Sequence, residues 1–166
     1  MEVVLVLHNI RSCYNVGAIL RTAEGLGVKR VYLSGYTPRV HDENLVPHLR
    51  EKIDHEIHKT ALGAEDLVKV ISEDDIKTMI VKCRTDGWQI VGLENNIKGN
   101  ICQLDDPNLK EKLGDRVILI LGEEVGGIDP ELHNLINEFL EIPMRGKKES
   151  FNVSVATGIA LFGLLY

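Results

Sequence analysis

The sequence lacks paired cysteines, long apolar runs and a positive net charge, and each deficit excludes a class of protein. Its three cysteines, Cys13, Cys83 and Cys102, are widely spaced, so neither a disulfide framework nor a zinc site is expected. No apolar run reaches the roughly 18 residues that a membrane span needs. The net charge of −6 argues against a broad, non-specific nucleic-acid binder, although it allows a local basic patch.

The chain also lacks a targeting segment, internal repeats and linkers. Its N-terminus, MEVVLVLHNIRS, has neither the basic start nor the small-residue cleavage site of a signal peptide, so we expect a cytoplasmic protein. A length of 166 residues predicts a single domain over residues 1–166, and a hydrophobic content of 44% excludes a disordered chain. The chain is long enough to bury a substantial core.

Short apolar runs alternate with segments of helical pattern. The run at 117–121 is the most apolar and should lie centrally in a sheet. Strand, loop and helix in this repeated order predict an α/β domain with a mostly parallel sheet flanked by helices. Residues 41–64 show no clear pattern. The expected strands are residues 3–7, 30–34, 89–93, 117–121 and 139–142, and the expected helices include 15–26 and 152–165.

Residues that favour helix caps mark where helices should begin and end. Asn15 can cap the first helix, and Gly27 fits the position just past its end. Ser72 with Asp75 resembles a capping box that opens a helix toward Arg84.

Three polar segments follow strands, and in parallel sheets ligands bind beyond the carboxyl ends of the strands. The first segment, NVGAILRTAEGLG, places Asn15 at a helix N-terminus, where free backbone N–H groups attract anions. Arg21 lies inside that helix and is equally well explained as an ordinary surface arginine.

The second segment, LILGEEVGGI, holds three glycines that let the backbone approach a ligand closely. It resembles a dinucleotide-binding turn only weakly, because the GxGxxG pattern is absent. The alternative is a plain glycine-rich turn in which Glu123 and Glu124 are solvated carboxylates.

The third segment, IPMRGKKESFNVSVATGIAL, joins a strand to an apolar helix through a basic, polar loop. Loops on rigid scaffolds often carry function, although an ordinary connection explains this one equally well. Ser150 is not part of a GxSxG elbow, so a hydrolase nucleophile is not expected. The six histidines form no evident ligand set, and we expect no metal.

Taken together and in this order, the three segments resemble the signature motifs of the SpoU/TrmH branch of the SPOUT RNA methyltransferases. The resemblance extends from Val4 to Leu161. It implies a homodimeric ribose 2′-O-methyltransferase that uses S-adenosylmethionine and has a C-terminal trefoil knot, a feature nearly absent from other proteins. It also implies an RNA substrate, with transfer RNA slightly favoured over ribosomal RNA, and a catalytic domain without a separate RNA-binding domain.

The resemblance assigns roles residue by residue. Basic residues in or beside the motifs are expected to form one RNA-binding patch, namely Arg11, Arg21, Arg145, Lys147 and Lys148. The family's cofactor contacts fall near Leu93, Gly122, Ile142, Met144 and Phe151, the last standing where leucine is usual. Its catalytic residues fall on Asn15, Arg21, Glu124, Ser150 and Asn152.

The resemblance leaves the role of Arg21 open, because an arginine stays protonated in proteins. Arg21 acts as a base only if the substrate phosphate and Ser150 or Asn152 reshape its hydrogen bonds. Otherwise it grips the phosphate as a cationic fork, and water takes the proton.

Two further alternatives remain at this stage. The final helix is apolar nearly all round, which predicts burial either against its twin in a homodimer or within its own domain. The rival functions are a catalytically silent RNA-binding or assembly protein of the same fold, and an α/β protein that binds a different nucleotide cofactor.

Overall fold

The computed structural model describes residues 1–166 and contains one seven-stranded sheet. The strands are β1 (Glu2–His8), β2 (Arg30–Ser34), β3 (Lys69–Glu73), β4 (Gln89–Leu93), β5 (Ile101–Gln103), β6 (Arg116–Leu121) and β7 (Glu138–Glu141). Their order is β3-β2-β1-β6-β4-β7-β5, and all neighbours are parallel. β6 therefore lies in the middle of the sheet, which confirms the position expected of the most apolar run.

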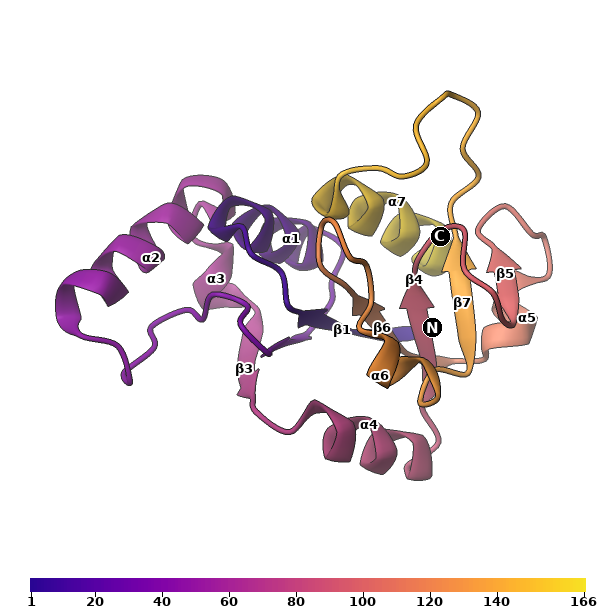
Figure 1. Cartoon of the computed structure of the whole chain (residues 1–166), viewed down its shortest axis with the longest axis horizontal. Coiled ribbons are helices and arrows are strands. Elements are labelled where there is room, and N and C mark those ends of the chain that lie inside the picture. The colour runs from indigo at the N-terminus through magenta and orange to yellow at the C-terminus, as the bar shows by residue number, and fades with distance from the viewer.

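Helices cover both faces of this sheet, which confirms the α/β class. They are α1 (Cys13–Gly25), α2 (Pro47–Ala61), α3 (Ala64–Leu67), α4 (Ile76–Thr85), α5 (Leu109–Leu113), α6 (Pro130–His133) and α7 (Val153–Leu165). Figure 1 shows α1 and α7 on one side of the strands and α4 on the other. None of the helices is both long and apolar enough to cross a lipid bilayer.

The side-chain alternation along β1 shows how the sheet holds these two layers. Successive side chains of a strand point to opposite faces. Leu5 and Leu7 join the larger core together with residues of α1 and α7, whereas Val4 and Val6 join the smaller core with residues of α4. A strand buried on both faces has to be apolar at every position, which is what the continuous apolar run indicates.

Two of the predicted caps are wrong, although the helices they were meant to open exist. α1 is capped by Ser12, whose hydroxyl accepts a hydrogen bond from the backbone N–H of Asn15 at 3.3 Å, so Asn15 lies in the first turn. Ser72 belongs to β3, and Asp75 alone caps α4 by accepting from the N–H of Thr78. Moving Asn15 into the helix frees its side chain for other contacts.

Several elements carry no clear sequence pattern. α2 and α3 lie in or directly after residues 41–64, which show no clear pattern. The sequence also did not predict β3, β5 and α5. α2 buries only Ile57 and Ala61, because most of its other positions are polar or charged. A helix with so narrow an apolar face has little of the periodic signal on which sequence analysis depends.

Four neighbouring strands bring the three motif loops to one edge of the sheet. In the order β1-β6-β4-β7, Leu7 pairs with Leu121, Leu121 with Leu93, and Leu93 with Leu140. These residues lie at or one position from the carboxyl ends of their strands, so the chain leaves all four strands at the same edge. This is where open parallel sheets bind ligands.

Candidate functional site

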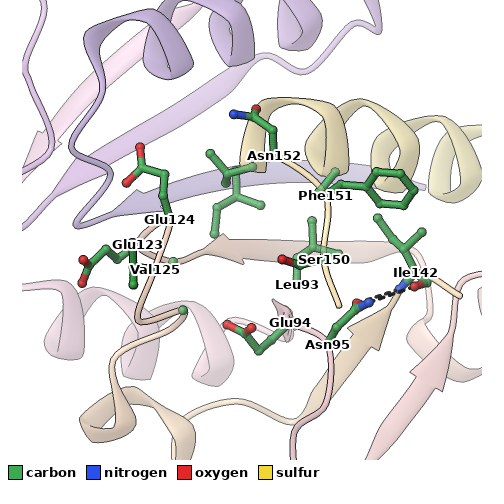
Figure 2. A pocket seen from close by; sticks show the side chains of 15 residues that line it. Leu93, Glu94, Asn95, Glu123, Glu124, Val125, Ile142, Ser150, Phe151 and Asn152 are labelled. Atoms are coloured by element: carbon green, nitrogen blue, oxygen red, sulfur yellow. Dashed lines mark hydrogen bonds between the residues drawn. The ribbon is translucent and has the colours of Figure 1, made fainter. Parts of the chain in front are cut away.

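A cavity of about 240 Å³ opens at this edge, between the loops that follow β4, β6 and β7. Figure 2 shows the side chains that line it, with the glycine-rich loop after β6 on one side and the segment before α7 on the other. The lining residues are Leu93, Glu94, Asn95, Leu121, Gly122, Glu123, Glu124, Val125, Gly127, Ile142, Ser150, Phe151, Asn152, Val153 and Ala156.

The cavity is acidic. Three carboxylates line it, those of Glu94, Glu123 and Glu124, and no lysine or arginine does. The apolar part of its wall comes from residues such as Leu93, Ile142 and Phe151. Opposite charges attract strongly where water is partly excluded, so the cavity suits a ligand with an apolar body and positive charge. It does not suit the phosphates of a dinucleotide.

The glycine-rich loop is held in a tight turn that only small residues allow. The backbones of Glu123 and Gly127 exchange two hydrogen bonds, at 2.9 and 3.0 Å. A Cβ atom on Gly122 would lie 2.3 Å from the carbonyl carbon and oxygen of Gly127. The carboxylate of Glu94 accepts from the N–H of Ile128 at 2.9 Å and so supports the loop from β4. The glycines therefore serve close backbone packing.

Glu124 links the glycine-rich loop to the start of α1. Its carboxylate accepts hydrogen bonds from the backbone N–H groups of Arg11 and Ser12, at 3.1 and 3.2 Å, and from the side-chain amide of Asn15 at 2.9 Å. Burial raises the pKa of Glu124, but the hydrogen bonds from Asn15 and Arg11 outweigh it and hold the pKa below its ordinary value. Glu124 is thus an ionised anchor at the N-terminus of a helix.

Asn15 also joins the third motif. The side-chain amide of Asn152 donates to Oδ1 of Asn15 at 3.2 Å, while its own Oδ1 accepts from the N–H and hydroxyl of Ser154 and caps α7. Asn15 therefore donates to Glu124 and accepts from Asn152. One residue from each of the three motifs takes part in a single hydrogen-bonded chain at the mouth of the cavity.

Most of the residues assigned from the resemblance lie together. Glu124, Ser150 and Asn152 line the cavity, and Asn15 is bonded to two of them. Four of the expected cofactor contacts, Leu93, Gly122, Ile142 and Phe151, also line it, whereas Met144 does not. Sequence reasoning missed Glu94 and Asn95. Their position directly after the strand at 89–93 is the signal that marks them.

Arg21 stands apart from this group. It is exposed on α1, its side chain makes no hydrogen bond or ion pair within the chain, and it does not line the cavity. It follows Asn15 by six positions, a rise of about 9 Å along an α-helix, and the two side chains leave the helix about 120° apart. Within one chain, Arg21 therefore does not face the Asn15–Glu124–Asn152 group.

The other basic residues lie in two places. Arg11 forms an ion pair with Glu123, and its guanidinium lies 5.9 Å from the ring centre of Tyr36. The remaining three, Arg145, Lys147 and Lys148, are exposed on the loop between β7 and α7, which stands out from the body of the molecule in Figure 1.

Fold and site define the class: an α/β protein with a parallel sheet covered on both faces and an acidic cavity at its carboxyl edge. The profile of the SpoU rRNA Methylase family matches residues 2–162, so the chain belongs to this family. The family expected from the three motifs is thereby confirmed.

Individual relatives agree with this assignment. The chain is 30% identical over 164 residues to the 23S rRNA (guanosine-2′-O-)-methyltransferase RlmB of Pectobacterium atrosepticum, covering 98% of this chain and 59% of that protein. A solved TrmH-family protein from Porphyromonas gingivalis is 27% identical, with a TM-score of 0.76 over 98% of this chain and 59% of that one. The AdoMet-bound rRNA methyltransferase from Sinorhizobium meliloti shares the fold, at 24% identity and a TM-score of 0.77 over 98% of this chain and 55% of that one. This chain thus spans somewhat more than half the length of these relatives.

Proposed function

We propose that this chain transfers the methyl group of S-adenosylmethionine to a ribose 2′-hydroxyl of RNA. The observation that carries the proposal is the chain of hydrogen bonds from Glu124 through Asn15 to Asn152, beside an acidic cavity. Three motifs far apart in the sequence converge there, and the family profile matches nearly the whole chain. A relative at 30% identity is named as a ribose methyltransferase of ribosomal RNA.

The charge of the cavity favours this cofactor over other nucleotides. S-adenosylmethionine carries an ammonium and a sulfonium cation, and when bound it supplies an already activated methyl group. Three carboxylates line the cavity and, although Arg11 pairs with Glu123 from outside, no lysine or arginine lines the wall, so the cavity favours such cations over phosphates. The apolar side chains of Leu93, Ile142 and Phe151 provide a wall for an adenine ring. The rival of an α/β protein that binds a phosphate-bearing cofactor is therefore disfavoured.

The residues at the mouth of the cavity position the ribose. Asn15 is held in one orientation, because its amide donates to Glu124 and its carbonyl oxygen accepts from Asn152. Ser150, exposed at the same wall, is free to bond the hydroxyl that reacts. Alignment of a hydroxyl with a methyl donor contributes several kcal/mol, up to roughly 7–11 in ideal intramolecular reactions.

A second copy of the chain would complete the site. Arg21 does not face the cavity of its own chain, and Val155 and Phe162 of α7 are exposed together with Tyr166, which directly follows the helix. Its other face, with Ala160, Leu161 and Leu164 among others, is buried within the chain. We propose a homodimer that covers the exposed face of α7 and brings Arg21 to the mouth of the partner's cavity, on the side of the RNA, with the basic loop against the same RNA.

The names of the curated relatives support ribosomal RNA as the substrate. The slight preference for transfer RNA expected from the sequence has no support among the curated relatives, whose names refer to 23S rRNA. A cytoplasmic location agrees with such a substrate. Phosphate contacts by Arg145, Lys147 and Lys148 would make binding salt-dependent, with a log–log slope near ~0.7 per contact on single strands.

A trefoil knot is the remaining part of the proposal. Its support is that Ser150 and Phe151, on the segment after β7, line the same cavity as Leu93 at the end of β4 and Gly122 after β6. A crystal structure would test it, because a path of residues 142–152 outside the loop formed by the preceding strands would contradict the knot.

The activity is tested by two measurements on the purified protein. Calorimetry with S-adenosylhomocysteine should show one binding site per chain, and ATP should show none. Mapping of 2′-O-methylation in total RNA, with and without the protein, should then reveal a new mark in ribosomal RNA. Binding without any new mark in RNA would favour the catalytically silent alternative. A new mark in transfer RNA alone would show that the substrate is transfer RNA and not ribosomal RNA.

A further inference from the structure

The side chain of Asn95, directly after β4, bonds to both ends of the loop between β7 and α7. Its amide Nδ2 donates to the carbonyl of Ile142 at 3.0 Å and to that of Glu149 at 3.3 Å. Its Oδ1 accepts from the N–H of Ile142 at 3.1 Å. Figure 2 shows Asn95 and Ile142 next to each other in the cavity wall, joined by a hydrogen bond.

These bonds continue the pairing of β4 with β7 beyond the end of the strands. The last backbone bond between them runs from the N–H of Glu94 to the carbonyl of Leu140, at 3.2 Å. Past this point the Asn95 side chain replaces a strand partner, because it pairs with both the N–H and the C=O of Ile142. A primary amide has both a donor and an acceptor, which few other side chains combine in this shape.

The bond from Asn95 to Glu149 fixes the far end of the loop as well as its start. Ile142 begins the loop and Glu149 ends it, so one side chain closes the neck of the excursion from Pro143 to Lys148. Ser150 and Phe151, which follow immediately, line the cavity. The wall that they form depends on where the neck is held.

We propose that Asn95 is a positioning residue that closes the neck of this loop and thereby shapes the cofactor cavity. The inference rests on the proposed function for the identity of the ligand, but not for the tether itself. Without the tether, the loop gains freedom at the point where it forms the cavity wall. Cofactor binding then has to order the loop, and that entropy loss weakens affinity.

The matched control is Asn137, an asparagine that directly precedes β7 and bonds the opposite end of β4. Its Oδ1 accepts from the backbone N–H of Ile90 at 3.0 Å, and it lines no part of the cavity. Asn137→Ala removes one side chain-to-backbone bond of β4, against three in Asn95→Ala, so it should lower Tm as well, although by less. Only Asn95→Ala should change the cavity.

The test measures S-adenosylhomocysteine binding by calorimetry and tryptic cleavage of the loop, which holds Arg145, Lys147 and Lys148. Asn95→Ala should bind about tenfold to a hundredfold more weakly than wild type and be cleaved faster there. Asn95→Asp should resemble it, because a carboxylate cannot donate to the two carbonyls. Asn137→Ala should match the wild type in both measurements.

The outcomes separate the two proposals. If wild type binds and both Asn95 variants bind as tightly as wild type, Asn95 has no special role and the inference is overturned. The same holds if Asn137→Ala weakens binding as much as Asn95→Ala does. If wild type does not bind, the proposed function fails. The tryptic cleavage rates then test by themselves whether Asn95 holds the loop. Equal rates in Asn95→Ala and Asn137→Ala would contradict that role.

Discussion

Asn152 donates its side-chain amide to Oδ1 of Asn15 at 3.2 Å, although 137 positions separate the two residues in the sequence. Asn152 caps α7, and Asn15 lies in the first turn of α1. The contact therefore joins the N-termini of two helices that pack on the same face of the sheet. Since Asn15 also bonds Glu124, the relationship explains why three distant motifs have to act as one unit.

Removal of Asn15 should separate catalysis from cofactor binding. Asn15→Ala leaves Glu124 and Asn152 without the side chain between them, yet Asn15 does not line the cavity itself. We expect a rate of RNA methylation about tenfold to a hundredfold lower, because a misplaced reacting group loses part of its alignment. Affinity for S-adenosylhomocysteine should stay within about threefold of wild type. A parallel loss of rate and affinity would show that Asn15 supports the cavity as well.

Arg21→Ala should abolish turnover while cofactor affinity remains near that of wild type. The residue is exposed and has no partner within the chain, so its removal should also leave Tm almost unchanged. Arg21→Lys keeps the charge but loses the planar fork, and we expect only partial activity. Calorimetry and methyl transfer from labelled S-adenosylmethionine measure both quantities. A large loss of affinity in Arg21→Ala would place Arg21 in the cofactor pocket.

The hydrogen bonds of Glu124 should make stability depend on pH. Because its pKa in the folded chain is below the ordinary value of 4.5, its contribution is present above that value and is lost as pH falls through the folded pKa. Glu124→Gln removes the charge, and its amide cannot accept all three bonds. The difference in Tm between wild type and Glu124→Gln should therefore be largest near pH ~7 and shrink in acid. A constant difference across this range would contradict the ionised anchor.

Gly122→Ala should distort the glycine-rich loop. The added methyl group would lie 2.3 Å from backbone atoms of Gly127, so the loop has to shift, at a cost of about 1–3 kcal/mol. We expect a lower Tm and weaker binding of S-adenosylhomocysteine, as measured by thermal melting with and without the ligand. Gly25→Ala is the control, because nothing lies within 4 Å of its Cβ position. Similar effects in both variants would mean that close packing at Gly122 is unimportant.

Phe162→Glu should convert the proposed dimer into a monomer. Phe162 is 60% exposed and stacks on Tyr166, which is 75% exposed, so together they present an apolar surface on α7. A buried charge without a partner opposes association. Light scattering after size-exclusion chromatography should give twice the chain mass for wild type and for the control Leu67→Glu, whose site is exposed on α3. A monomeric wild type would overturn the dimer.

Much of the fold could be predicted from local patterns. The strands β1, β2, β4 and β6 and the helices α1 and α7 have continuous or periodic apolar residues, because each is buried deeply enough to require them. α2 could not be recognised, since only two of its residues are buried. The cap of α1 was misassigned because Ser12 and Asn15 both suit that position, and only the backbone path decides between them.

By itself, the sequence determined the fold class, the central strand and the residues of the three motifs, since each depends on residue type and local spacing. Tertiary structure alone decided how those residues are used. It placed Asn15 between Glu124 and Asn152, tied Arg11 to Glu123, left Arg21 outside the cavity and brought Glu94 and Asn95 into it. The physical reason is that such contacts depend on which strands are neighbours and where each side chain points, and neither is encoded within any one segment.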